Sequence, residues 1–198
     1  MSLANYRRGW VGLGVVALIG LVAACKDAEQ KGQPAVDPRE AVFVDFAKRL
    51  DAYMKVREEV EDSIGDLDPT RSQAEIATRA TALGQSLIAR RAQAKPGDIF
   101  TPEIATILAT LIKEEYSRRS EPVQETREDQ QDELPDFTPR VNQVYPTTYP
   151  LATFPATLLP LLPPLPEKVE YRIVQNYLVL RDIEANLIID FMPNAVPM

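Results

Sequence analysis

Few side chains of this sequence can carry out chemistry: it has 29 acidic residues, one cysteine and no histidine. The missing histidine excludes Ser-His-Asp and Cys-His nucleophiles, histidine-ligated zinc and histidine-ligated haem. A single cysteine excludes a disulfide or a thiolate cluster within one chain. Only four glycines lie beyond residue 24, and their spacing cannot form a nucleotide-binding loop. The remaining possibilities are carboxylate chemistry and a modification of Cys25.

Carboxylates gather near the end of the first predicted helix. The members of this cluster are Glu58, Glu59, Glu61, Asp62, Asp66 and Asp68. Their spacing lacks the central glycine and the closing glutamate of an EF-hand loop, so no calcium or other metal site is predicted. We interpret the cluster as a solvated face that Arg57 partly offsets. A carboxylate-only hydrolase is a minor alternative, because two acids in a cleft suffice for it, but no pair stands out.

The residues before Cys25 are typical of an export signal. Two arginines, Arg7 and Arg8, precede an uncharged apolar run over residues 11–24, which is shorter than the roughly 20 residues that span a membrane. Val22-Ala23-Ala24-Cys25 resembles the lipobox of bacterial lipoproteins. The resemblance implies that residues 1–24 are a signal peptide and that Cys25 carries the lipid anchor of the mature chain. There are two alternatives. The signal peptide could be cleaved in the ordinary way and leave Cys25 as a free thiol, or it could stay uncleaved as a membrane anchor.

The net charge and the residue after Cys25 indicate which partners and which membrane to expect. The full chain has a net charge of −7, and loss of two arginines with residues 1–24 makes it −9. A nucleic-acid partner is therefore not expected. By resemblance to lipoprotein sorting, Lys26 slightly favours the outer membrane, with the protein facing the periplasm or the cell surface.

Capping residues predict a helical unit over residues 37–119, after a polar tether at 25–36. Asp37-Pro38 opens the first helix and Gly65 ends it. The second begins after Thr70 or Ser72 and stops before Pro96-Gly97, and the third runs from Thr101-Pro102 towards Tyr116. Short connections predict three antiparallel helices.

The C-terminal part changes character twice. Residues 120–136 are rich in charge and poor in apolar residues, which predicts a mobile acidic linker. The remainder, 137–198, begins with a proline-rich stretch over 137–166 that should run extended and cover the core with its leucines. Residues 167–192 carry the β-branched and aromatic residues of strands. The fold class predicted is α+β, with a small three-stranded antiparallel β-meander at the C-terminus.

The strand residues also predict a register. A two-residue turn at Gln175-Asn176 places Tyr171 opposite Leu180, Ile173 opposite Leu178 and Glu170 opposite Arg181. A four-residue loop at 183–186 then places Leu180 opposite Ile189 and Leu178 opposite Phe191.

The predicted register gives the sheet one apolar face and one solvated face. The apolar face should cover the helices, while Arg172 and Asp190 flank Val179 on the outer face. We therefore expect partners to dock on the outer face or on a free edge strand.

Several blocks of the chain resemble a group of uncharacterised exported bacterial proteins. The blocks are Gly97–Glu103 (GDIFTPE), Val141–Pro146 (VNQVYP), Leu162–Pro166 (LPPLP), Glu170–Arg172 (EYR), Leu178–Asp182 (LVLRD) and Ala185–Phe191 (ANLIIDF). The resemblance implies an exported module and supplies no catalytic residue.

Together these observations predict a lipid-anchored cell-envelope protein that is not an enzyme and acts as a binding or structural module with an envelope protein partner. No cofactor and no small-molecule ligand are expected. A regulatory or inhibitory partner of a periplasmic enzyme is the alternative function.

Overall fold

In the computed structural model, three helices begin at the predicted residues, and the first ends before Gly65 as predicted, whereas the second ends at Arg90, well before the predicted stop at Pro96-Gly97. Helix α1 spans Pro38–Ile64, α2 spans Gln73–Arg90 and α3 spans Pro102–Ser117. The Asp37 carboxylate accepts a hydrogen bond from the Arg39 N–H, and the Ser72 hydroxyl accepts one from the Glu75 N–H. These bonds satisfy main-chain donors that a helix start leaves open.

The structure describes residues 37–65, 69–118, 137–146, 149 and 154–196. They belong to one compact unit that spans Val36–Met198. The predicted signal peptide 1–24, Cys25, the tether 25–36 and the linker 120–136 lie outside the described residues.

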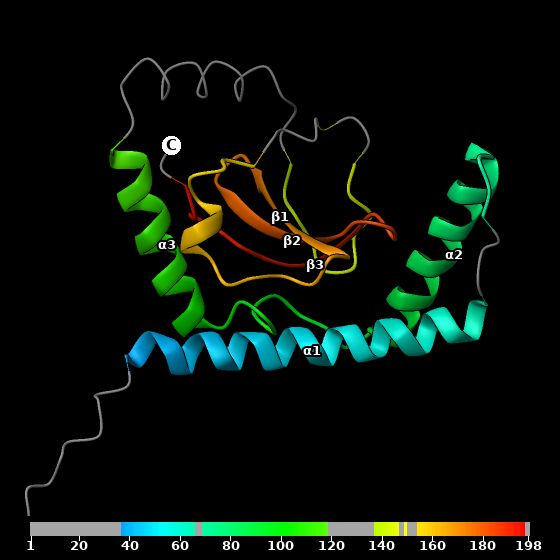
Figure 1. Ribbon diagram of the computed structural model, residues 1–198, viewed down its shortest axis with the longest axis horizontal. Helices are drawn as coiled ribbons and strands as arrows, with labels where there is room; N and C mark the ends of the chain where they lie inside the picture. The colour runs from blue at the N-terminus through cyan, green and yellow to red at the C-terminus, as the bar shows by residue number, and fades with distance from the viewer. Residues whose placement is uncertain (1–36, 66–68, 119–136, 147–148, 150–153, 197–198) are drawn as a thin grey trace, which may run out of the picture. The chain divides into compact units, whose positions relative to one another are not determined.

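The helices are not arranged as antiparallel neighbours. Helix α1 packs on both α2 and α3, which stand at opposite ends of it in Figure 1. With 27 residues, α1 is about 40 Å long, so the two shorter helices contact different parts of it. The sheet lies between α2 and α3 (Figure 1).

The sheet confirms the predicted α+β class and the C-terminal meander. Strands β1 (Val169–Val174), β2 (Tyr177–Asp182) and β3 (Leu187–Met192) are antiparallel in the order β1-β2-β3. The register of β1 on β2 is as predicted, with Tyr171 opposite Leu180 and Glu170 opposite Arg181.

The predicted register of β2 on β3 is right next to the 183–186 loop, where Asp182 lies opposite Leu187 and Arg181 opposite Ile188, but it is wrong by one residue beyond that point. Leu180 lies opposite Asp190 and Leu178 opposite Met192, because a β-bulge follows Leu180. The bulge adds Ile189 to β3, and Ile189 packs in the core shared with the helices. Asp190 accepts hydrogen bonds from the main-chain N–H groups of Gly97, Ile99 and Phe100 on the same side. The side chains of two consecutive residues, Ile189 and Asp190, therefore both contact the helix side of the sheet, which a β-bulge allows.

Helices and sheet share one core. Its fully buried members include Phe46, Leu50, Ile104, Leu108, Ile112, Leu158, Leu178, Leu180 and Ile189. Helix α2 adds Leu83 and Leu87, which pack with Val60 and Leu187, whereas Ile76 of its predicted apolar stripe is 43% exposed. At Gly84 an added Cβ would lie 3.2 Å from the Ala185 carbonyl oxygen, so glycine permits the close approach of α2 to the β2–β3 loop.

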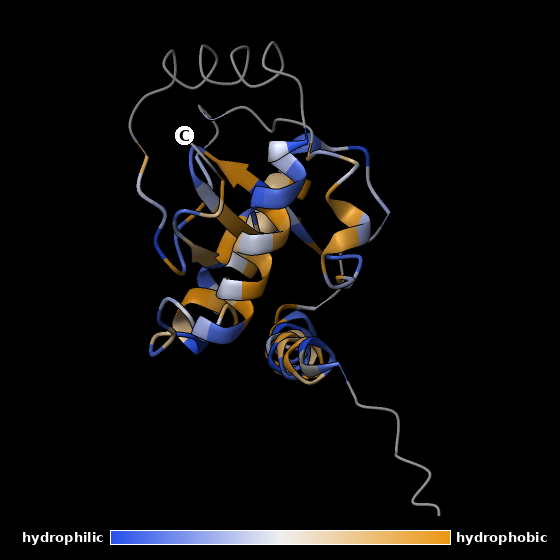
Figure 2. Ribbon diagram, turned by 90° about the vertical axis from the view of Figure 1, so that its left-hand side faces the viewer, coloured by the Kyte–Doolittle hydropathy of each residue, from blue (hydrophilic) through white to orange (hydrophobic). Residues whose placement is uncertain are grey.

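The outer face of the sheet is covered, which corrects the predicted solvated face. Phe137, Tyr145 and Tyr149 pack there against Val179 and Ile188, both of which are fully buried. The strands accordingly consist mainly of hydrophobic residues (Figure 2). The part of the outer face over Val179 and Ile188 is therefore not open to a partner.

Candidate binding groove at the edge of the sheet

The two edges of the sheet differ in whether the main chain is already paired. At the β3 edge, the Asn142 N–H donates to the Ile188 carbonyl oxygen at 2.9 Å and the Ile188 N–H donates to the Gln143 carbonyl oxygen at 2.8 Å. Val144 also forms a bridge with Leu187. The segment after the predicted linker thus closes the β3 edge, so the free edge strand that was predicted can only be β1.

Strand β1 turns half of its main-chain groups away from β2. The two-residue turn makes Val174 and Tyr177 a hydrogen-bonded pair, so alternate residues of β1 point towards β2 and the others point outwards. The outward residues are Val169, Tyr171 and Ile173. The Val169 N–H donates to the Pro166 carbonyl oxygen at 3.0 Å. Among the described residues, no main-chain group bonds to the outward N–H and C=O of Tyr171 or Ile173.

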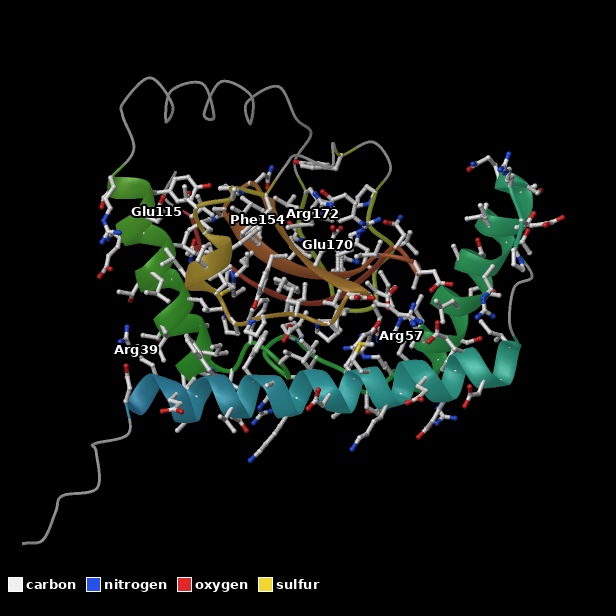
Figure 3. All side chains as sticks on the ribbon, viewed as in Figure 1. Arg39, Arg57, Glu115, Phe154, Glu170 and Arg172 are labelled. Atoms are coloured by element: carbon white, nitrogen blue, oxygen red, sulfur yellow. The ribbon has the colours of Figure 1, made fainter. Side chains whose placement is uncertain are left out.

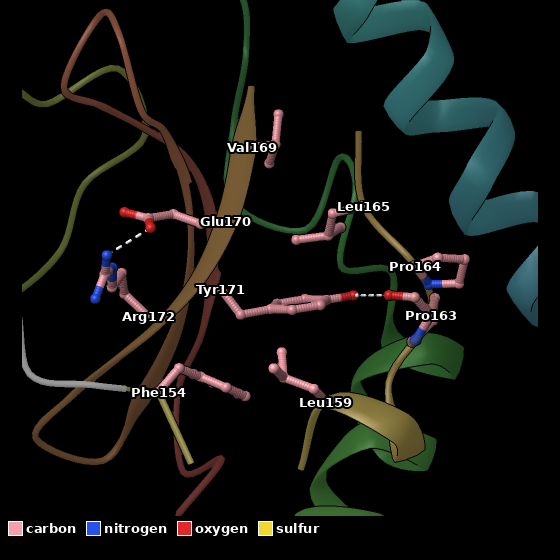
Figure 4. Close-up of a pocket in the computed structure, with 9 residues that line it drawn as sticks. All are labelled: Phe154, Leu159, Pro163, Pro164, Leu165, Val169, Glu170, Tyr171 and Arg172. Carbon is pink, nitrogen blue, oxygen red and sulfur yellow. Dashed lines mark hydrogen bonds and ion pairs between the residues drawn. The ribbon is translucent and has the colours of Figure 1, made fainter. Parts of the chain in front are cut away.

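A groove of about 610 Å³ runs along this edge. It is lined by Phe154, Leu159, Pro163, Pro164, Leu165, Val169, Glu170, Tyr171 and Arg172. Glu170 and Arg172 project to one side of β1 and Tyr171 to the other (Figure 4). Since side chains from both faces of the strand line the groove, the groove lies at the strand edge itself.

The apolar wall of the groove is the proline-rich segment. The Tyr171 hydroxyl donates a 3.0 Å hydrogen bond to the Pro163 carbonyl oxygen, which fixes this segment against β1 (Figure 4). Leu162 is buried and Leu165 packs on the core, which confirms that the leucines of this stretch cover the core. The short helix η1 (Leu159–Leu161) places Leu159 at the surface, where it is 54% exposed.

The polar wall is an ion-pair cluster. Glu170 pairs with Arg172 at 2.5 Å and also with Arg181, its partner across the hairpin. Burial raises the pKa of the Glu170 carboxyl, but the hydrogen bonds from the two arginines outweigh burial and hold this pKa below its usual value. Figure 3 shows Phe154, Glu170 and Arg172 close together at the sheet. Within the described lining, Glu170 is the only carboxylate, so the groove offers no second acid for two-carboxylate hydrolysis.

A second groove of about 610 Å³ lies at the start of α1, between Phe43, Val44, Leu111 and Leu161. Two of its walls are helices, whose main-chain groups are used within the helices themselves. It therefore offers a partner apolar contact but no ladder of main-chain hydrogen bonds.

Away from the grooves, Arg57 is the centre of a buried ionic cluster that sequence reasoning missed. Its Nε lies 2.7 Å from Asp182 Oδ2, and its two terminal nitrogens pair with Glu61 and Glu184. The Tyr53 hydroxyl donates to the same Asp182 oxygen at 2.7 Å. Arg57 and Asp182 are both fully buried, whereas Glu58, Glu59 and Asp62 of the acidic cluster are exposed, as predicted. Arg57 offsets that cluster through its pair with Glu61, from a buried position. The interruption of the apolar spacing at this position was the available signal.

Asp190, predicted to be solvated, is a second buried polar centre. Its Oδ1 accepts from the N–H groups of Gly97 and Phe191, and its Oδ2 accepts from those of Ile99 and Phe100, at 2.8–3.0 Å. Burial raises the pKa of the Asp190 carboxyl, although the main-chain donors act in the opposite direction. The carboxylate thus joins two of the blocks quoted above, GDIFTPE and ANLIIDF.

The other predicted sites are placed as follows. Cys25, the predicted lipidation site, lies outside the described residues. Of the acidic cluster, Glu61 pairs with Arg57 and Lys168, and Glu59 pairs with Arg90. Residues 37–65, 69–118, 137–146, 149 and 154–196 contain no group of three or more potential metal ligands. No helix in these ranges is long and apolar enough to cross a membrane.

Comparison of the chain with family models, with curated proteins and with solved structures gives no match.

Proposed function

We propose that this protein is a lipid-anchored, non-catalytic binding module of the cell envelope, and that it binds an extended polypeptide strand along the edge of β1. The outward main-chain groups of Tyr171 and Ile173 beside the groove carry this proposal. An extended polypeptide is complementary to these main-chain donors and acceptors, because it can hydrogen-bond to them as one further strand of the sheet.

The lining of the groove supports a peptide rather than a small molecule. An added strand alternates its side chains between the two faces of the sheet. One set would meet the apolar wall of Phe154, Leu159 and Leu165, and the other would meet the Glu170–Arg172 pair. Main-chain bonds would give affinity and the two walls would give selectivity.

Site-specific photocrosslinking tests the docking. With p-benzoylphenylalanine at Phe154, irradiated membranes are expected to yield a defined adduct of the full-length chain, because this aromatic residue lines the groove. The same group at Ile76, an exposed apolar residue of α2, is the matched control. Adding Ile173→Pro to the Phe154 probe removes one outward N–H and should abolish the adduct. Equal adducts from both positions, or an adduct that survives Ile173→Pro, would exclude docking by strand addition.

Membrane anchoring has its own test. The Cys25→Ser chain is expected to move from the membrane pellet to the soluble fraction, because the apolar run 11–24 is too short to hold it as a spanning helix. Fractionation of cells that express each form measures this. The Lys26→Ser chain changes the neighbouring residue but keeps the cysteine, and it should stay in the pellet. Continued membrane association of Cys25→Ser would favour an uncleaved anchor instead.

A further inference from the structure

We infer that the strand paired with the β1 edge comes from a second copy of this chain, so that two sheets join into one across a two-fold axis at Tyr171. This inference rests on the proposed function and names the partner of the same groove. Its basis is the sequence of the outward edge, Val169-Glu170-Tyr171-Arg172-Ile173, which is complementary to itself when it is read in the antiparallel direction.

The hydrogen-bonding groups fit this arrangement. With Tyr171 on the axis, its N–H meets the C=O of Tyr171 in the other copy, and the reverse bond forms by symmetry. The Ile173 N–H meets the Val169 C=O of the other copy. The Val169 N–H is already bonded to Pro166 and is not required. Four main-chain bonds result, all from groups that point away from β2.

The charged residues select this register over its neighbours. Centring on Tyr171 places Glu170 opposite Arg172 twice, at positions where opposed side chains lie closest. Centring on Arg172 instead would oppose two arginines. Centring on Glu170 would oppose two glutamates and place Lys168 against Arg172. Sliding one strand by a single residue fails for a different reason. It places the outward N–H and C=O groups of one copy opposite residues of the other copy whose main-chain groups already bond to β2.

The apolar residues agree with the same register. Val169 lies opposite Ile173, and the exposed Leu159 and the partly buried Phe154 of each wall flank the joined strands. Charged residues usually protect an edge strand against pairing. Here the charged residues disfavour the two neighbouring registers, which are centred on Glu170 and on Arg172. Anchoring at a membrane surface, as proposed above, would raise the effective concentration of one copy for another.

Sedimentation of the full-length chain in detergent tests the inference. The chain is expected to form a dimer whose population rises with concentration. Ile173→Pro removes two donors per dimer without touching the β1–β2 ladder, and should raise the dissociation constant about thirtyfold. Ile173→Ala keeps the N–H and is the matched control, for which we expect a change of less than about threefold.

Charge exchange tests the register. Glu170→Arg alone and Arg172→Glu alone each oppose like charges in the dimer, and each should weaken self-association about tenfold. A mixture of these two variants should associate as tightly as the unchanged chain, because each supplies the charge that the other lacks. Circular dichroism checks that each variant is folded. If Glu170→Arg unfolds through its contacts with Arg181, the Arg172→Glu variant and Ile173→Pro still decide the outcome.

The results separate the two proposals. A chain that stays monomeric up to about 100 μM, or a dimer that Ile173→Pro and the charge variants leave unchanged, overturns the inference. If the Phe154 photocrosslink then gives an adduct with a different protein that Ile173→Pro abolishes, the proposed function stands with another partner. If neither dimer nor edge-dependent adduct forms, both proposals fail.

Discussion

Replacement of Arg57 by methionine is expected to lower the free energy of unfolding by about 3–5 kcal/mol, the usual cost of breaking a buried ion pair. Methionine fills much of the volume, so the loss arises mainly from Asp182, whose carboxylate would stay fully buried without its cation. Urea unfolding followed by far-UV circular dichroism measures the change. Arg90→Met is the matched control, because Arg90 pairs with Glu59 at the surface and such pairs contribute about 1 kcal/mol or less.

A double-mutant cycle shows whether the buried charge is the cause. In Arg57→Met with Asp182→Asn, the amide oxygen can still accept from the Ala185 N–H, and its NH₂ can donate to the Tyr53 hydroxyl. The double variant should therefore lose at least about 1 kcal/mol less than the two single variants added together. Additive losses would mean that packing around Arg57, and not its charge, stabilises this part of the fold.

The second large effect is expected at Asp190. Asp190→Asn should lower the free energy of unfolding by about 2–5 kcal/mol, because two buried N–H donors lose their acceptor and face an NH₂ group instead. Either orientation of the amide leaves one such pair, Gly97 and Phe191 or Ile99 and Phe100. The same urea titration measures the loss.

Asp98→Asn makes the same chemical change in the same loop and serves as the control. Among the described residues, the Asp98 carboxylate accepts a hydrogen bond only from the Lys95 N–H, through one oxygen. An amide oxygen can replace that acceptor, so we expect a change within about 0.5 kcal/mol. An Asp190→Asn variant as stable as the Asp98→Asn variant would show that Asp190 is not the centre that joins the loop to β3.

The sequence predicted the features that depend on residues close together in the chain, namely the helix starts and the β1–β2 register. Two helix starts follow from Asp37 and Ser72, whose side chains accept main-chain hydrogen bonds within one turn of chain. The third follows from Pro102 as the first helical residue, since Thr101 before it forms no side-chain cap bond. The β1–β2 register follows from the turn at 175–176, which leaves no freedom once its length is two residues.

The β2–β3 register could not be predicted in the same way. Alternation of side chains assumes an unbroken pleat, and it placed Asp190 in solvent because an unpaired carboxylate is costly to bury. The structure removes that cost with main-chain donors about 90 residues away in sequence. Nothing near Asp190 in the sequence indicates those donors.

The sequence predicted that the sheet has a free edge strand, but not which strand it is. A free edge strand was expected, but which edge is free depends on residues 142–145, which close the β3 side. Their sequence shows no strand of its own, because they pair through three main-chain hydrogen bonds rather than through a regular ladder. The cover of the outer face by Tyr145 and Tyr149 has the same origin.

The order of these elements along the chain has a consequence for how the protein is made. Residues near the C-terminus, such as Ala195 and Val196, are buried in one core with Phe46 and Leu50 of α1. The helices therefore cannot complete this core until residues 158–196 have left the ribosome, and closing so long a loop makes folding slow. If the chain is exported as we propose, it would stay unfolded and competent for translocation during its synthesis. It would fold only after translocation.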